Sequence, residues 1–249
     1  MHRFTHHSSL ITHHFSLITY HSSLITHHLS LITYHSSLIT HHLSLITHHF
    51  SLITYHLSLL PMTQEQDIKN AIEVLRQGGV ILYPTDTVWG IGCDATNAEA
   101  VAKVYRIKQR DDSKALICLV DSDARLQRYV RQVPDVAWQL IDCVVKPTTL
   151  VLDGAVNLAP NLIAPDGSIG IRITQEPFSR QLCYRFQKAI VSTSANISGQ
   201  PAAQNYCDID PLILQQADYV CFSRRQEHQP HQPSAIIKLG LGGEVKVIR

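Results

Sequence analysis

Three polar clusters in this 249-residue chain have residue types that can hold an anionic ligand. The first, YPTDT at 83–87, directly follows an apolar run, where ligand-binding loops of α/β folds tend to lie, although Pro, Thr and Asp are also common in turns. The second groups Lys108, Arg110 and Lys114, which could bind phosphate or carboxylate, or only complement a helix C-terminus. The third, VSTSANISG at 191–199, follows another apolar run and has the composition of a neutral phosphate cradle, although Ser/Thr-rich loops are common.

An arginine inside an apolar stretch is the fourth candidate feature. Arg172 lies in IGIRI at 169–173, and an Arg in such a position needs an anionic partner, either an internal carboxylate or that of a ligand. The two His of the C-terminal part, His228 and His231, lie together in one polar segment, so no Ser-His or Cys-His nucleophile pair is supported. The GxGxxG, Walker A, HExxH and GxSxG motifs do not occur. The remaining chemistry is of the phosphoryl type, in which positioning and charge neutralisation matter most.

The elements that would position these clusters alternate between helix and strand. A capping box at Thr63 and Gln66 predicts a helix that stops at Gly78, and Asn97 caps a second helix that ends near Lys108. Further helices are predicted at 123–131, 134–144 and 177–186. Strands are predicted at 80–83, 115–120, 149–152, 169–173, 189–191, 219–222, 235–239 and 245–248. This order indicates an α/β domain with one central mixed sheet.

Residues 1–61 differ sharply from residues 62–249. They repeat a seven-residue unit such as HHFSLIT and contain 14 of the 16 His, one basic residue and no acid. A coiled coil is disfavoured because Leu and Ile are adjacent instead of spaced as a and d. His-rich tracts can bind metal, but we expect instead a disordered or aggregation-prone segment, or a stretch upstream of a natural start at Met62. Residues 62–249 are then the single folded domain.

Composition excludes several classes of protein. The chain has 21 Lys and Arg against 20 Asp and Glu, a net charge of +1, which argues against a strongly basic nucleic-acid binder. No apolar run approaches the roughly 18 residues that a membrane span needs. The six Cys form no CxxC pair and are expected to be buried free thiols rather than metal ligands or disulfides, which indicates a reducing, cytoplasmic location.

Residues 66–249 resemble the YrdC-like threonylcarbamoyl-AMP synthases, in the short, single-domain form. The matching pieces, in the family's order, are YPTDTVWGIGCDA at 83–95, KQRDDSK at 108–114, IGIRIT at 169–174 and STSANISGQP at 192–201. A weaker match is PSAI at 233–236, which is similar to a Pro-Ser-Thr segment of the family. The resemblance implies a YrdC-like twisted mixed sheet with flanking helices around an open cavity.

The activity implied by the resemblance is that of an L-threonylcarbamoyladenylate synthase, a nucleotidyltransferase. It would form threonylcarbamoyl-AMP and pyrophosphate from L-threonine, bicarbonate and ATP, with Mg²⁺ neutralising the phosphates. The product would serve threonylcarbamoyladenosine modification of tRNA next to the anticodon, through downstream tRNA threonylcarbamoyl-transferase proteins. No membrane partner is implied.

The resemblance also implies roles for nine residues, none of them a metal ligand. Those implied to be catalytic are Lys108, Arg110 and Ser192. Those implied to bind threonine are Thr85, Arg172 and Lys114, with Arg172 on the carboxylate. Those implied to bind ATP are Lys108, Arg110, Thr149, Ser194 and Asn196.

The chain departs from the family pattern at two positions. Ala115 stands where a Pro is usual, and Lys146 replaces a Gly, which would change the loop before Thr149 or add a charge to the cavity. Two alternative functions follow from the same fold: a non-catalytic RNA-binding relative, and a carbamoyl-transfer domain like that of hydrogenase maturation proteins. The KQR and STSAN elements favour the synthase over RNA binding, and no acylphosphatase or zinc-finger segment accompanies the domain.

Overall fold

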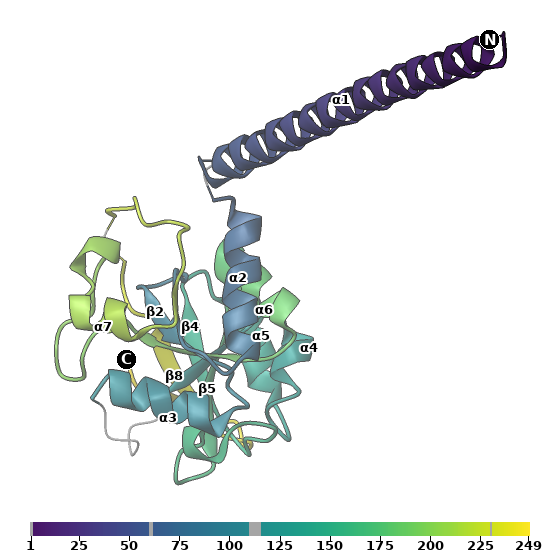
Figure 1. The fold of residues 1–249 in the computed structure, drawn as a ribbon. Helices are drawn as coiled ribbons and strands as arrows, with labels where there is room; N and C mark the ends of the chain where they lie inside the picture. The colour runs from purple at the N-terminus through teal and green to yellow at the C-terminus, as the bar shows by residue number, and fades with distance from the viewer. Residues whose placement is uncertain (1, 60–61, 110–115, 230) are drawn as a thin grey trace. The chain divides into compact units, whose positions relative to one another are not determined.

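The chain forms two compact units, residues 1–61 and residues 62–249, and the boundary in the sequence falls at the end of the repeat. A computed structural model describes residues 2–59, 62–109, 116–229 and 231–249 (Figure 1). Among these residues, no helix combines the length and the apolar character that crossing a bilayer requires.

The first unit is one helix, α1 (His2–Leu59), where the sequence predicted disorder or aggregation. Its local bonding explains the difference, because no Gly or Pro interrupts residues 2–59 and polar side chains bond back to the preceding turn. The Thr19 hydroxyl donates to the Phe15 carbonyl at 3.0 Å, and a ring nitrogen of His21 lies 2.8 Å from the Leu17 carbonyl. Every side chain of 13–53 is exposed, so α1 has no core of its own. A natural start at Met62 stays a prediction.

The described part of 62–249 contains a mixed sheet of nine strands in the order β7-β1-β2-β6-β3-β5-β4-β8-β9. The strands are β1 (Ile81–Tyr83), β2 (Gly90–Gly92), β3 (Ile117–Val120), β4 (Thr148–Asp153), β5 (Ser168–Ile173), β6 (Ile190–Ser194), β7 (Tyr219–Val220), β8 (Ala235–Leu239) and β9 (Val245–Val247). The pairs β1–β7, β3–β5 and β4–β8 are parallel, and the other pairs are antiparallel. The predicted mixed sheet is therefore confirmed.

Helices flank this sheet. They are α2 (Gln64–Arg76), α3 (Ala98–Ile107), α4 (Asp123–Leu126), α5 (Asp135–Cys143), α6 (Pro177–Phe186) and α7 (Pro211–Gln216), with short 3-10 turns at Pro160–Leu162 and Tyr206–Asp208. Helices α2 and α6 pack side by side against the sheet (Figure 1). Both predicted N-caps are confirmed: Thr63 accepts from the Gln66 amide, and Asn97 accepts from the amides of Glu99 and Ala100.

Two predictions about elements were wrong. The helix predicted over 123–131 ends at Leu126, because the chain then turns and Val130 forms a β-bridge with Ala155. No strand was predicted at Gly90–Gly92, which forms β2 shortly after the first polar cluster.

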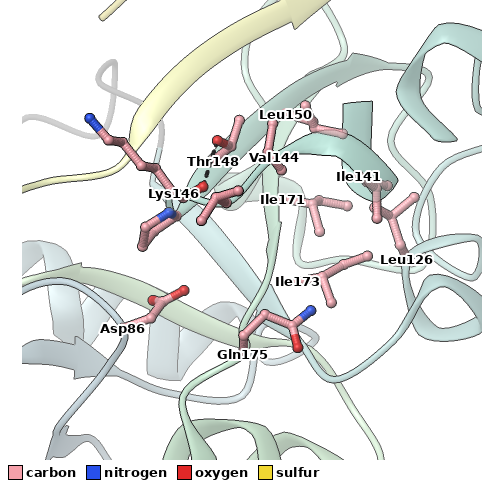
Figure 2. Close-up of a pocket in the computed structure, with 12 residues that line it drawn as sticks. Asp86, Leu126, Ile141, Val144, Lys146, Thr148, Leu150, Ile171, Ile173 and Gln175 are labelled. Atoms are coloured by element: carbon pink, nitrogen blue, oxygen red, sulfur yellow. Dashed lines mark hydrogen bonds between the residues drawn. The ribbon is translucent and has the colours of Figure 1, made fainter. Parts of the chain in front are cut away.

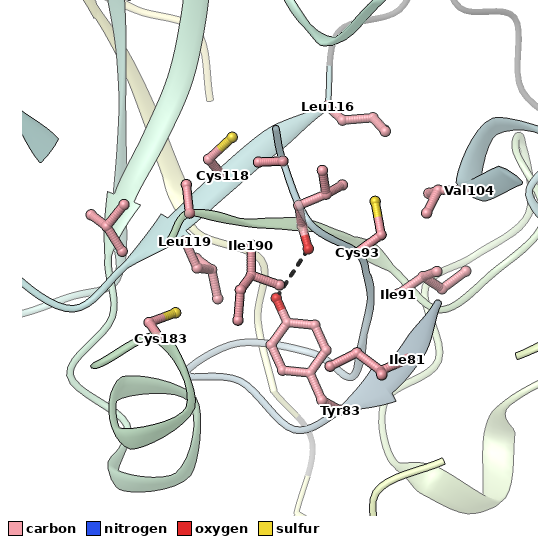
Figure 3. Packing of buried hydrophobic residues seen from close by; sticks show 14 of the residues in the cluster. Ile81, Tyr83, Ile91, Cys93, Val104, Leu116, Cys118, Leu119, Cys183 and Ile190 are labelled. Atoms are coloured by element: carbon pink, nitrogen blue, oxygen red, sulfur yellow. Dashed lines mark hydrogen bonds between the residues drawn. The ribbon is translucent and has the colours of Figure 1, made fainter. Parts of the chain in front are cut away.

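The core lies between the sheet and its helices, and small sulfur-containing side chains fill part of it. Figure 3 shows Cys93, Cys118 and Cys183 among aliphatic residues, next to Tyr83, whose hydroxyl donates to the Val191 carbonyl at 3.2 Å. Cys221 is also buried, and burial raises the pKa of all four thiols. The remaining two cysteines, at 143 and 207, are exposed, contrary to the expectation that all six are buried.

Candidate active site

The register of the central strands brings Ser192, Ser194 and Arg172 onto one face of the sheet. Ser194 of β6 pairs with Gly90 of β2, and Ser192 pairs with Ile117 of β3, which in turn pairs with Gly170 of β5. Because side chains alternate along a strand, these residues and Arg172 share a face. Gly170 leaves the face open, since a Cβ there would lie 2.8 Å from a methyl carbon of Ile117.

This face forms the wall of a cavity of about 240 Å³. The polar residues of its described wall are Thr87, Arg172, Ser192, Thr193, Ser194, Ser234 and Arg249. No carboxylate occurs among the described residues of the wall. Two guanidinium groups and a set of hydroxyls therefore face the same space, which suits an anionic ligand.

Arg172 has an internal partner and also a spare donor. Its side chain is only 3% exposed, and it forms an ion pair with Asp86 at 3.0 Å and donates to the Thr87 hydroxyl at 3.2 Å. No acceptor among the described residues reaches its Nε. Burial lowers the pKa of Arg172, and burial likewise raises the pKa of Asp86. The sequence left open whether the partner of Arg172 is an internal carboxylate or a ligand, and the structure shows that it is Asp86. Arg172 also lines the cavity, and its buried Nε has no partner among the described residues.

Thr85 and Thr87 are arranged differently from the prediction. The Thr85 hydroxyl is buried in its own loop, where it donates to the Val88 carbonyl at 2.8 Å and accepts from the Thr87 amide at 3.1 Å. The hydroxyl oxygens of Thr85 and Thr87 are 3.0 Å apart, and of these two residues Thr87 lines the cavity. Thr85 thus shapes the loop that presents Thr87 to Arg172.

Lys108 and Asn196 hold the STSAN loop. The Lys108 ammonium is 1% exposed and donates to the carbonyls of Ser194, at 2.5 Å, and Asn196, at 2.7 Å. The Asn196 amide donates to the Gln200 carbonyl at 2.7 Å, and its side-chain oxygen accepts from the Ser194 hydroxyl. Neither residue lines the described cavity wall, so both act here on the shape of the loop that carries Ser192 and Ser194.

Thr149 lies behind the wall. It is fully buried on β4, and its hydroxyl lies 2.9 Å from that of Ser234, which lines the cavity. Arg249 donates from Nε to the Ser234 carbonyl at 3.1 Å and contributes the second guanidinium of the wall. The sequence assigned no role to Ser234 or Arg249. The PSAI segment at 233–236, which is similar to a segment of the family, could have indicated Ser234 as a site residue. No feature of the sequence around Arg249 indicates a role for it.

Four positions that the sequence singled out remain. Arg110 and Lys114 lie outside the described residues, as does Ala115. Lys146 lines a second pocket of about 100 Å³, together with Ile171 and Ile173, on the face of β5 opposite Arg172. Its ammonium points away from Asp86 there (Figure 2), so Lys146 adds no charge to the described wall of the larger cavity.

Known proteins resemble this chain in sequence and in fold. Residues 73–249 match the family model of Sua5, YciO and YrdC proteins, which carries the description "Telomere recombination". A threonylcarbamoyl-AMP synthase of Pseudoalteromonas translucida is 36% identical over 161 residues, covering 64% of this chain and 86% of that protein.

Two solved structures share the fold. Escherichia coli YciO superposes with a TM-score of 0.65 at 24% identity, over 76% of this chain and 90% of that one. Sua5 of P. abyssi, solved in complex with L-threonine, gives 0.63 at 22% identity, over 72% of this chain. The present chain spans 52% of that Sua5 chain.

Proposed function

This chain belongs to the Sua5/YciO/YrdC family, and from that premise we propose that it is a synthase that makes threonylcarbamoyl-AMP and pyrophosphate from L-threonine, bicarbonate and ATP. The observation that carries the proposal is the cavity wall, where Arg172 and Arg249 face the hydroxyls of Ser192, Ser194 and Ser234. A carboxylate and a phosphate chain both need such donors.

The reaction needs little covalent chemistry from the protein. The amine of threonine combines with bicarbonate, losing water, to give a carbamate. A carbamate oxygen then attacks the α-phosphorus of ATP, and the bond to the β-phosphate oxygen breaks as pyrophosphate leaves. In displacements at phosphorus, positioning and electrostatic stabilisation supply most of the catalysis. The transfer of AMP makes the enzyme a nucleotidyltransferase.

The threonine end of the cavity is assigned to Arg172. Its unpartnered Nε can donate to the amino-acid carboxylate while the ion pair with Asp86 keeps the guanidinium oriented. Thr85 acts by shaping the loop around Thr87. Because the cation is already fixed before substrate binds, little ordering remains to be done on binding.

The nucleotide end is assigned to the STSAN loop and Arg249. Ser192 and Ser194 offer hydroxyls to the phosphates, and Lys108 and Asn196 keep the loop in shape. Thr149 supports Ser234 from behind the wall. For Arg110 and Lys114, the proposed roles on the phosphates rest on the family resemblance.

Magnesium is assigned to the substrate. Mg²⁺ prefers oxygen ligands and is often held by one or two carboxylates plus substrate phosphates. The described wall has no carboxylate, and no group of three or more His, Cys, Asp or Glu among the described residues could hold a metal. The described residues therefore do not fit a resident metal site, and Mg²⁺ would enter with ATP.

The product is a reactive mixed anhydride and needs an acceptor. We propose that it is consumed in threonylcarbamoyladenosine formation on tRNA, by a separate threonylcarbamoyl-transferase. All six cysteines are free thiols, which supports a reducing compartment such as the cytoplasm.

The test is pyrophosphate release by the full chain with ATP and Mg²⁺, each of threonine and bicarbonate being omitted in turn. Release that requires both supports the synthase. Release that does not require threonine would identify an enzyme that hydrolyses ATP to AMP and pyrophosphate. No release from folded protein would favour the RNA-binding relative, which titration with unmodified tRNA would then detect.

A further inference from the structure

A surface arginine outside the cavity wall contacts the loop that holds Arg172. Arg224 donates from NH1 to the carbonyl oxygen of Thr85 at 3.0 Å. Arg224 lies in the polar segment after β7, and its side chain is 21% exposed. Its hydrogen bonds and ion pairs join it to no described residue of the cavity wall, so its link to the site runs through the loop.

A continuous set of hydrogen bonds leads from Arg224 to the site. The Thr85 carbonyl accepts from Arg224, and the hydroxyl of the same residue lies 3.0 Å from that of Thr87. The Thr87 hydroxyl in turn accepts from Arg172 at 3.2 Å. A shift of the loop backbone would therefore change the orientation of Arg172, which lines the cavity.

Arg224 is itself fixed from two sides. Its Nε donates to the Glu227 carboxylate at 2.7 Å, and its NH1 lies 3.3 Å from the Glu176 carboxylate. Glu176 caps α6 by accepting from the amides of Phe178 and Ser179, so it cannot move freely. The hydrogen bond with Arg224 also lowers the pKa of Glu227, which keeps this carboxylate charged.

The backbone at Arg224 is in the left-handed region, with φ at 62°. A side chain with a Cβ adopts this conformation only at a cost in energy, which surrounding contacts must offset. The contacts with Thr85, Glu176 and Glu227 do so here. The residue is thus held in an otherwise unfavourable conformation that aims its guanidinium at the loop.

We propose that Arg224 is a positioning residue for the L-threonine subsite: it fixes the backbone of the 85–87 loop and thereby the orientation of Arg172. The inference rests on the proposed function, because it concerns the binding of L-threonine. It predicts an effect on threonine that ATP does not share.

The decisive variant is Arg224→Gly in the full chain. Glycine adopts positive φ without strain, so the backbone at position 224 keeps its conformation while the guanidinium is removed. We expect the KM for L-threonine to rise about tenfold, the typical consequence of losing a hydrogen bond from a charged donor. The KM for ATP and the melting temperature should stay within error of the wild type.

Arg225→Ala is the matched control. This neighbouring arginine donates to the carbonyls of Val220 and Cys221, and its guanidinium lies over the rings of Tyr206 and Phe222. None of these contacts is with the 85–87 loop, so the loss of Arg225 should leave the KM for threonine unchanged. Arg224→Lys, which keeps one cationic donor, should give a KM between those of the wild type and Arg224→Gly.

The outcomes separate this inference from the proposed function. If the wild type shows no threonine-dependent pyrophosphate release, the proposed function is refuted, independently of the results for the Arg224 variants. An active wild type together with an unchanged KM for threonine in Arg224→Gly overturns the inference. It is equally overturned if the KM values for threonine and ATP rise together, or if Arg225→Ala has the same effect. Should Arg224→Gly not fold, Arg224→Lys with a wild-type KM would overturn it.

Discussion

Replacing Arg172 by Met would remove the buried cation and leave its partner carboxylate in place. The variant keeps the aliphatic length of the side chain but loses the 3.0 Å ion pair with Asp86 and the 3.2 Å hydrogen bond to Thr87. Asp86 is only 10% exposed, so water can replace little of what is lost. The structure predicts a destabilised protein as well as an inactive one.

The size of the destabilisation follows from the two states open to Asp86. A buried charge left without its partner costs about 3–5 kcal/mol. The carboxyl can instead bind a proton, which for a group with a pKa near 3.9 costs about 4 kcal/mol near pH 7 and about 1.5 kcal/mol near pH 5. Asp86 adopts whichever of these two states is lower in free energy, so the loss of stability cannot exceed the cost of that state. We therefore expect Arg172→Met to lose about 3–4 kcal/mol of unfolding free energy near neutral pH.

The dependence on pH has a definite sign. Burial already raises the pKa of Asp86, and loss of Arg172 removes an interaction that lowers it. The folded variant therefore binds a proton that the unfolded chain releases. A group with a raised folded pKa stabilises the fold fully below its unfolded pKa, and this contribution is lost as pH rises through the folded pKa. The deficit of Arg172→Met should thus shrink from neutral pH towards pH 5.

Urea denaturation of the full chain at both pH values, followed by circular dichroism, measures this deficit. The double variant Asp86→Asn with Arg172→Met is the control, since it has no orphaned charge. Near neutral pH, the double variant should have an unfolding free energy about 2 kcal/mol higher than that of Arg172→Met. It should still release no pyrophosphate. A deficit below about 0.5 kcal/mol, or one that does not change with pH, would refute the claim that the pair is buried and coupled.

Four further outcomes are expected. Lys108→Met should lower the unfolding free energy by about 2 kcal/mol and nearly abolish pyrophosphate release, because two loop carbonyls lose their donor. Gly92→Ala should cost about 2–3 kcal/mol in urea denaturation, since its Cβ would lie 2.6 Å from a backbone carbonyl oxygen of β6. Iodoacetamide should modify only Cys143 and Cys207 before denaturation, as read by mass spectrometry, because burial raises the pKa of the other four thiols. Residues 62–249 alone should keep wild-type turnover, because this unit contains the whole described cavity wall.

Local signals in the sequence were enough for the helices that begin at a cap. Thr63 and Asn97 were identified from residue type and spacing alone, and both accept the expected amide hydrogen bonds. Strand β2 could not be identified in this way. Its Gly-Ile-Gly sequence has no apolar alternation and low strand propensity, and it is a strand only because β1 and β6 pair with it on either side. Such pairing depends on the whole sheet.

The site shows the same limit. Sequence pattern identified Arg172 as a cation that needs a partner, but Asp86 lies 86 positions earlier and meets it only through the arrangement of β5 and the 83–87 loop. Likewise, Arg249 reaches the cavity wall because β8 and β9 fold back beside β4. Residue type can nominate a candidate for a site, whereas its partner and its depth in the fold are non-local properties.

The Asp86–Arg172 pair is better explained by ligand binding than by stability. Burial lowers the pKa of Arg172 and raises that of Asp86, so each charge is harder to maintain inside the fold than in water. A pair of apolar side chains in the same place would often stabilise a protein more. The ion pair provides a guanidinium that is fixed in direction, on a residue that lines the cavity, and its Nε has no partner among the described residues. An incoming carboxylate would satisfy that donor without breaking the pair, so binding restores a hydrogen bond that folding left unmade.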